Sequence, residues 1–244
     1  MNKRNNYQSG FLLLFVAVFL VMPFVSSCGK SGTVSPSALN IQYQVVNLSP
    51  NLGSVDLYIN FTKVNSFSYF YPNASGYFFL NKIDTPFQIR PGTSLIPGTI
   101  APSRNIFTFD TILKPNGKYT LMIVGINKPD SLLAFVTRDD TVSLPATGRG
   151  KIRFINASPR SAGVDVTANG TPIFSGQIYP QISAFVPVPA GTYDFQIFPK
   201  GGSTVLRDVP NVVIQDGRIY TFYCYGQAGR TDSLAFGSGI ITNR

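Results

Sequence analysis

The sequence predicts an all-β protein in which two tandem immunoglobulin-like β-sandwiches follow an apolar N-terminal segment. Two observations carry this prediction. Short runs of aromatic and β-branched residues alternate with turns rich in Pro, Gly and Asn, and beyond the N-terminal segment no window shows the 3.6-residue apolar stripe of a helix. Several ordered blocks of sequence also occur twice, which is expected of a duplicated domain.

Residues 1–27 are predicted to be a signal peptide. Lys3 and Arg4 form a basic start, and an apolar stretch follows at Phe11–Val25. The alternative of a membrane span is disfavoured, because this stretch is shorter than the ~18–20 residues that cross a bilayer and it contains Pro23.

The small residues just before Cys28 (Val25-Ser26-Ser27) resemble a bacterial lipobox, although the commonest lipoboxes carry Leu where Val25 stands. The resemblance implies that the signal is removed before Cys28 and that this cysteine is lipidated, for instance with palmitate. The protein would then be anchored in a membrane of the cell envelope through its N-terminal lipid. Ordinary secretory cleavage, which leaves Cys28 as a free thiol, is the alternative.

Residues 28–40 are predicted to be a flexible tether, because Gly29–Asn40 is small, polar and proline-containing. Such a segment has a root-mean-square reach of about 20 Å. No acidic run follows Cys28. In some Gram-negative bacteria an acidic run there resembles a surface-export signal, so its absence favours the periplasmic face of the outer membrane; the leaflet stays open.

The internal repeat divides the rest of the chain. Repeat 1 is predicted at 41–137, a linker at 138–150 and repeat 2 at 151–238, a tandem arrangement of domains of about 100 residues. The matching blocks occur in the same order in both copies: Asn47-Leu48-Ser49-Pro50 with Asn156-Ala157-Ser158-Pro159, Val55-Asp56-Leu57 with Val164-Asp165-Val166, Phe87-Gln88-Ile89 with Phe195-Gln196-Ile197, and Asp130-Ser131-Leu132 with Asp232-Ser233-Leu234.

Each repeat is expected to contain seven or eight short strands, the number typical of a sandwich. In repeat 1 we expect strands at Ile41–Asn47, Val55–Asn60, Gly76–Leu80, Thr85–Arg90, Ile106–Ile112, Lys118–Ile126 and Leu132–Thr137. In repeat 2 we expect them at Lys151–Ala157, Val164–Ala168, Thr171–Phe174, Ser183–Val188, Thr192–Phe198, Val212–Gln215, Arg218–Tyr225 and Ser233–Phe236.

Three blocks of repeat 2 resemble the DUF4397 domain. These are Ile152–Pro159 followed by Val164-Asp165-Val166, the stretch Pro187–Tyr193, and the late Gly217 with Tyr220-Thr221. Repeat 1 departs from the pattern, because it lacks Pro-Ala-Gly-Thr-Tyr and carries a Pro- and Gly-rich insertion at 91–105. The resemblance implies a β-sandwich of an exported bacterial protein or lipoprotein. It implies no catalytic residue.

The composition argues against most enzyme chemistry. The chain has no His and no Glu, and its 11 acidic residues are all Asp. Imidazole-dependent nucleophiles are therefore absent, and a structural zinc site would need Cys or His clusters. No phosphate-binding or nucleic-acid motif is present despite the net charge of +9. We expect no enzyme activity, no metal, no cofactor and no nucleic-acid partner; a glycosidase built on an Asp pair is a remote alternative.

The candidate ligand contacts lie in the aromatic-rich stretch Phe67–Phe79, at Tyr69, Phe70, Tyr71 and Tyr77. Exposed aromatic rings stack on sugars or anchor proteins, but the same rings can fill a core or a contact between the repeats. Both interpretations stay open here. The repeated Asn47, Ser49, Asn156 and Ser158 are expected to bind nearby backbone, and Asp56 and Asp165 to face water or pair with a turn.

A short pattern, Asp followed by Ser or Thr and an aliphatic residue, resembles the acceptor of a periplasmic O-glycosylation system. It marks Thr111, Ser131, Thr141 and Ser233. Together these features predict a non-enzymatic lipoprotein that binds or scaffolds an envelope protein or polysaccharide. The alternative is a surface protein that captures carbohydrate or adheres through exposed aromatics.

Overall fold

The computed structural model describes residues 39–92, 104–126 and 131–244. The predicted signal peptide, Cys28 and most of the tether lie outside the described residues, as does part of the insertion at 91–105. Every regular element of the described chain is a β-strand. Within those residues there is no helix of the length and apolarity needed for a transmembrane span.

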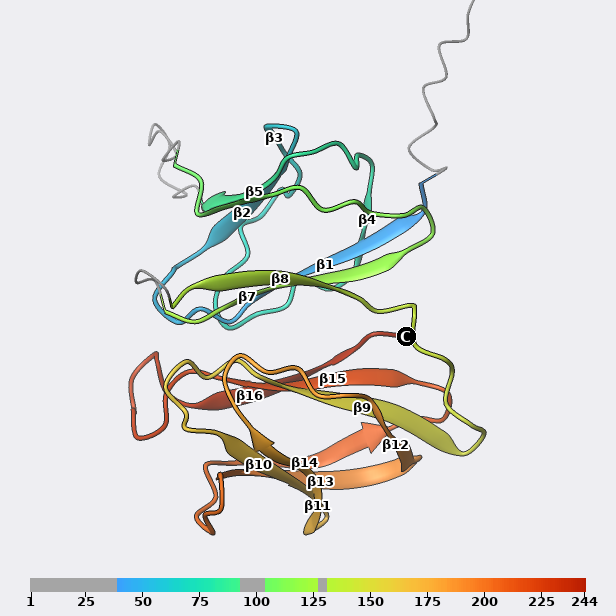
Figure 1. Cartoon of the computed structure of the whole chain (residues 1–244), viewed down its shortest axis with the longest axis vertical. Coiled ribbons are helices and arrows are strands. Elements are labelled where there is room, and N and C mark those ends of the chain that lie inside the picture. Colours follow the sequence, from blue (N-terminus) through green and yellow to red (C-terminus); the bar gives the residue numbers. More distant parts are fainter. Residues whose placement is uncertain (1–38, 93–103, 127–130) are drawn as a thin grey trace, which may run out of the picture. The chain divides into compact units, whose positions relative to one another are not determined.

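Repeat 1 is a sandwich of two four-stranded sheets (Figure 1). One sheet has the order β4-β1-β7-β8 and the other the order β3-β2-β5-β6. The strands are β1 (Ile41–Asn47), β2 (Val55–Ile59), β3 (Thr62–Lys63), β4 (Phe78–Leu80), β5 (Phe87–Pro91), β6 (Phe107–Phe109), β7 (Lys118–Val124) and β8 (Leu133–Arg138).

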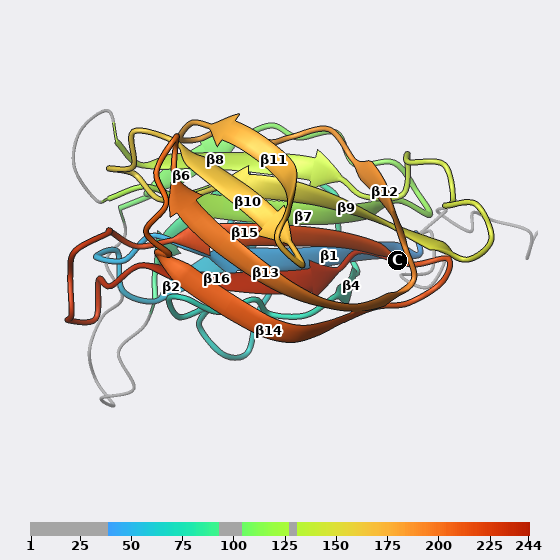
Figure 2. The ribbon, with the colours of Figure 1, turned by 90° about the horizontal axis from the view of Figure 1, so that it is seen from below.

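Repeat 2 has the same topology, with sheets β12-β9-β15-β16 and β11-β10-β13-β14. Figure 2 shows the second of these sheets face on, with β11, β10, β13 and β14 side by side in that order. The strands are β9 (Arg149–Asn156), β10 (Val164–Ala168), β11 (Thr171–Gln177), β12 (Val186–Pro189), β13 (Gly191–Pro199), β14 (Arg207–Ile214), β15 (Ile219–Tyr225) and β16 (Gly237–Thr242).

These sheets confirm the prediction of an all-β chain with tandem sandwiches. Each of β1 to β8 has its counterpart in β9 to β16, and in both repeats the central pair of one sheet is parallel: β1 with β7, and β9 with β15. The last strand differs from the expectation. Ser233–Phe236 is not a strand, and β16 begins at Gly237 and continues past the predicted boundary at 238. β16 begins Gly-Ser-Gly, and these residues are not typical of a strand, so a pattern of β-branched and aromatic residues did not predict its start.

The central strands β1, β7, β9 and β15 are buried on both faces, so polar side chains such as Gln44 and Arg153 are buried on them beside the apolar ones. On β1, Ile41, Tyr43 and Val45 point into the core of repeat 1. Val46, on the opposite face of the same strand, belongs to a separate apolar cluster. Repeat 2 has its own core, built around Phe154, Phe195 and Phe222.

That separate apolar cluster joins the two repeats. Val46 and Met122 of repeat 1 pack with Ile155 and Tyr223 of repeat 2 in it. The outward faces of the β4-β1-β7-β8 and β12-β9-β15-β16 sheets therefore cover each other, and residues 39–244 form one compact unit.

A buried charge pair lies beside this apolar cluster. A guanidinium N–H of Arg153 donates to Asp139 at 2.8 Å, with the Asp139 side chain fully buried and the Arg153 side chain 6% exposed. Asp139 also accepts hydrogen bonds from Thr120 (2.6 Å) and from the Tyr77 hydroxyl (2.9 Å). The hydroxyl of Tyr77 in turn accepts a bond from Asn243 of repeat 2 at 3.1 Å. These bonds satisfy a carboxylate that would otherwise be costly to bury.

The charge pair is built from equivalent positions of the two repeats. Thr120 donates to Asp139 and Thr221 donates to Asn243, both at 2.6 Å, so Asn243 is the counterpart of Asp139. Gln44 is opposite Thr120 in the β1–β7 register, and Arg153 is opposite Thr221 in the β9–β15 register. Repeat 1 therefore supplies the anion, Asp139, where repeat 2 has the amide of Asn243. Repeat 2 supplies the cation, Arg153, where repeat 1 has the amide of Gln44.

Candidate functional site

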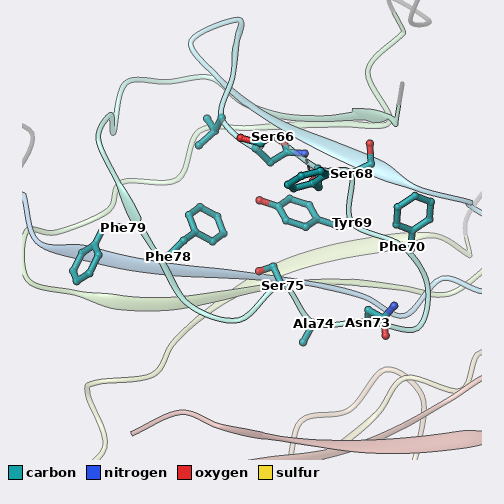
Figure 3. Close-up of a pocket in the computed structure, with 12 residues that line it drawn as sticks. Ser66, Ser68, Tyr69, Phe70, Asn73, Ala74, Ser75, Phe78 and Phe79 are labelled. Carbon is teal, nitrogen blue, oxygen red and sulfur yellow. Dashed lines mark hydrogen bonds between the residues drawn. The ribbon is translucent and has the colours of Figure 1, made fainter. Parts of the chain in front are cut away.

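A pocket with a volume of about 520 Å³ opens on the surface of repeat 1. It is formed by the chain between β3 and the end of β4, and Figure 3 shows Phe70 and Phe79 on opposite sides with Tyr69 and Phe78 between them. The lining residues are Val64, Asn65, Ser66, Phe67, Ser68, Tyr69, Phe70, Asn73, Ala74, Ser75, Phe78 and Phe79. They include hydroxyls and amides but no charged side chain.

Three phenylalanine rings of the pocket are exposed to solvent. The exposed fractions are 82% for Phe67, 53% for Phe70 and 59% for Phe79. A phenylalanine side chain gains about 1.5–3 kcal/mol when it is fully buried. These rings forgo much of that gain in the free protein, and grouped exposed rings of this kind mark a binding surface.

Asp56 holds one side of the pocket in place. Its buried carboxylate accepts hydrogen bonds from Ser68 (2.7 Å) and Asn65 (2.9 Å) and pairs with Lys63 Nζ at 2.8 Å. Asn65 also accepts a bond from the backbone N–H of Leu57 at 2.8 Å. Asp56 therefore pairs with a nearby loop, one of the two roles expected of it.

Asn47 and Ser75 fix the other side. The Asn47 amide donates to the carbonyl of Tyr69 at 3.1 Å, and its oxygen accepts from Ser49 N–H at 3.2 Å. Ser75 Oγ accepts from Val45 N–H at 3.0 Å. Asn47 thus binds nearby backbone as expected, and its counterpart Asn156 does the same. These hydrogen bonds hold both ends of the loop that carries the exposed rings.

Tyr69 forms the floor of the pocket. Its ring stacks on Phe78, with the centroids 6.3 Å apart. Burial, and then the negative charge of Asp56, raise the pKa of the Tyr69 phenol above its usual value. The hydroxyl therefore stays protonated throughout the physiological range.

The structure separates the four predicted ligand contacts into two pairs. Tyr69 and Phe70 line the pocket. Tyr71 instead packs edge-on against Tyr225 of repeat 2, with ring centroids 5.5 Å apart, and Tyr77 belongs to the network around Asp139. Phe67 and Phe79 also line the pocket; the sequence did not single them out, although both belong to the aromatic stretch Phe67–Phe79.

Repeat 2 lacks these aromatic rings on the same scaffold. Val55 and Val164 are equivalent first residues of β2 and β10. Tyr69 forms a β-bridge with Val55, and Gln177 pairs with Val164, so Gln177 is the counterpart of Tyr69. The next residue, Ile178, is then the counterpart of Phe70. Phe79 pairs with the second residue of β1 (Gln42), as Pro187 pairs with Lys151 on β9. Where Phe67 stands in repeat 1, the stretch 173–176 of repeat 2 presents no exposed ring.

The predicted glycosylation positions differ in access. Thr141 and Ser233 are exposed, whereas Thr111 and Ser131 are half-buried. The Thr141 hydroxyl donates to the carbonyl of Arg138 at 3.3 Å. The aspartate that precedes Ser131 lies outside the described residues.

The remaining reactive groups are not arranged for catalysis at the pocket. Cys224 is fully buried, and burial raises the pKa of its thiol to about 12. No Asp belongs to the lining, so a pair of carboxylates for glycoside hydrolysis is not found there. In the described chain no group of three or more His, Cys, Asp or Glu side chains is placed to hold a metal ion.

Comparison with known families gives a match over most of the chain. The profile described as a domain of unknown function, DUF4397, matches residues 42–165 and residues 150–237. The first segment covers repeat 1 and continues through β9 to the start of β10, and the second covers repeat 2 as far as the start of β16, so the two overlap at 150–165. No curated protein matches the chain.

Proposed function

Because the chain belongs to the DUF4397 family, which is defined without a function, we propose its function from the geometry of its own two repeats. We propose that it is a non-enzymatic binding module of the cell envelope and that repeat 1 carries the ligand site. The site is the pocket bordered by the exposed rings of Phe67, Phe70 and Phe79.

The observation that carries this proposal is the difference between the repeats. Repeat 2 builds the same sheets in the same order with Gln177, Ile178 and Pro187 at the positions of Tyr69, Phe70 and Phe79, and with no exposed ring at the position of Phe67. The scaffold therefore does not need an aromatic group at these positions. Exposed aromatic rings that the fold does not need, on a loop that is already fixed, are a feature of ligand sites.

The lining favours a polysaccharide as the ligand. No charged side chain borders the pocket, which suits a neutral molecule better than an ionic one. A sugar ring offers an apolar C–H face for stacking on an aromatic ring and hydroxyls for hydrogen bonds. Ser66 and Asn73 supply a hydroxyl and an amide in the lining for the second purpose. An envelope protein anchored by the same rings is the second candidate.

Attachment to the envelope is the other part of the proposal. The predicted signal at 1–27 and the lipobox-like residues before Cys28 support lipidation at Cys28 and an anchor in the outer membrane of a Gram-negative bacterium. The short tether would keep repeat 1 near the polysaccharides of the envelope. We expect cells grown with radiolabelled palmitate to incorporate it into the wild-type protein and not into Cys28→Ala.

Alanine replacement of the three exposed rings tests the ligand site. Phe67→Ala/Phe70→Ala/Phe79→Ala is expected to lose at least tenfold in affinity for envelope polysaccharide, measured by affinity electrophoresis. Ile178→Ala/Val213→Ala is the matched control, since it removes exposed apolar side chains from repeat 2. Tyr77 is unsuitable for this test because its loss would disturb the contact between the repeats.

Two results would contradict the proposal in different ways. Unchanged polysaccharide binding by the triple variant would remove the pocket from the function. If wild type binds no polysaccharide but crosslinks to an envelope protein through the three rings, the ligand is a protein.

A further inference from the structure

Cationic side chains gather where the tether enters the fold. The carbonyl of Leu39 accepts a hydrogen bond from the Asn116 N–H at 2.8 Å, and Asn40 Nδ2 donates to Asn116 Oδ1 at 3.1 Å. These bonds fix the entry point beside the start of β7. Asn40 also lines a small polar hollow together with Lys118, Asp140 and Arg244.

The strand topology brings further cations to the same end. The parallel strands β9 and β15 start there, and the backbone N–H of Ile219 donates to the Arg244 carbonyl at 3.1 Å. The Gly217 N–H donates to the carbonyl of Arg149 at 2.9 Å, which puts Arg149 next to Arg218. Burial lowers the pKa of Lys118. The negative charge of Asp139 opposes this shift, and the positive charges of Arg218 and Arg244 add to it, as expected for like charges that lie close together.

Three carboxylates lie at the same end of the fold, and each binds groups other than the side chains of Arg149, Arg218 and Arg244. Asp140 pairs with Arg138 Nε at 2.8 Å, and Asp139 is buried against Arg153. The Asp216 side chain accepts hydrogen bonds from the backbone N–H groups of Gly148 and Arg149, at 2.7 and 3.1 Å. Arg149, Arg218 and Arg244 are exposed, and none of them forms an ion pair with an Asp of the described chain.

We propose that Arg149, Arg218 and Arg244, which we call the tether-end surface, dock the protein on the anionic headgroups of the membrane that anchors it. The proposal rests on the attachment at Cys28 put forward above. A tether of this length reaches about 20 Å. The tether-end surface can therefore contact headgroups close to the point where the lipid on Cys28 enters the membrane. Charge attraction acts over about 8–10 Å at physiological salt, so the surface must come close to the headgroups to act.

Docking would give the protein a preferred orientation. A tether alone lets the domains tumble, whereas a second, electrostatic contact holds one end against the bilayer. A basic side chain near an anionic membrane strengthens binding by about fivefold. Three such residues would therefore add roughly a hundredfold to the retention that the lipid provides.

Vesicle binding tests the proposal without the lipid. The unlipidated chain from residue 29 contains every described strand and both cores, and it is mixed with vesicles of phosphatidylcholine alone or with one-third phosphatidylglycerol. We expect binding only to the anionic vesicles, weakened by salt, and about a hundredfold loss for Arg149→Gln/Arg218→Gln/Arg244→Gln.

A second triple variant controls for net charge. Arg160→Gln/Lys200→Gln/Arg207→Gln removes the same charge from exposed positions, and the first two of these positions follow the ends of β9 and β13. It is expected to bind as wild type does, and circular dichroism confirms the folding of both variants. Equal loss in the two variants, or no salt-sensitive binding at all, would overturn the proposal. Because the chain is unlipidated and no polysaccharide is present, failure here leaves the tests of Cys28 and of the pocket unaffected.

Discussion

The buried pair of Asp139 and Arg153 is predicted to hold the two repeats together, and its own counterparts provide the variants that test it. Asp139→Asn copies Asn243, and Arg153→Gln copies Gln44. Each single variant leaves one charge buried without its partner. The double variant replaces the ion pair with two amides that can bond to each other.

The structure sets the size of the effect. Asp139 is fully buried and Arg153 nearly so, and removing one member of such a pair costs about 3–5 kcal/mol. For a chain of this size that corresponds to a fall in Tm of roughly 6–20 °C. The double variant leaves neither charge unpaired, so we expect a coupling energy of about 2–3 kcal/mol between the two sites.

Urea unfolding followed by circular dichroism measures these free energies, which suits a chain without tryptophan. The control is the neighbouring pair of Arg138 and Asp140, which is partly exposed and should contribute far less than the buried pair because solvent screens it. The single variants should also be cut faster by protease within 138–150, between the repeats. If each single variant loses less than about 1 kcal/mol in free energy of unfolding and the double-mutant cycle shows no coupling, Asp139 and Arg153 do not hold the two repeats together.

Three further outcomes are expected. Tyr77→Phe should cost about 1–3 kcal/mol in urea unfolding, because the hydroxyl bonds to Asp139 and Asn243 are lost; no change would contradict the network. Cys224 should resist iodoacetamide at pH 8 until urea unfolds the chain, and rapid labelling of the folded protein would show that the thiol is accessible. Stability should be flat from pH 6 to 8, since there is no His, and should fall above about pH 9. Above about pH 9 the unfolded state loses protons that the folded state keeps, so the free energy of unfolding falls as the pH rises. Urea midpoints that increase with pH in this range would contradict the prediction. The groups concerned have pKa values raised by burial to about 12: Tyr71, Tyr179, Tyr223 and Cys224.

The sequence was sufficient to predict the fold class and most strands, because both depend on local patterns. Repeated blocks such as Val55-Asp56-Leu57 and Val164-Asp165-Val166 lie on equivalent strands β2 and β10, as the repeat required. The parallel pairing of β1 with β7 was not predictable in this way. Strand order depends on contacts between distant residues, and alternation along one strand does not reveal its neighbours.

The candidate site was only partly predictable, for a related reason. The stretch Phe67–Phe79 was identified by its aromatic content, but composition does not say which way a ring points. Tyr71 and Tyr77 contact repeat 2, whereas Phe67, Phe70 and Phe79 are exposed. Alternation along a strand indicates that some rings lie outside the core, but it does not say which of them a second repeat covers. Here the hydroxyl of Tyr77 serves the buried network, and the plain phenylalanines face solvent.

Three successive residues at β4 show how duplication divided these roles. Tyr77 bonds to Asp139, Phe78 packs on the core of repeat 1, and Phe79 lines the pocket. In repeat 2 Phe185 directly precedes β12, the counterpart of β4, and the guanidinium of Arg153 lies 4.8 Å from the centroid of its ring. The face that joins the repeats thus keeps an aromatic ring in both copies, while the exposed position carries one only in repeat 1. A ring retained in both copies is explained by packing, and the ring confined to one copy is the one that a ligand has to explain.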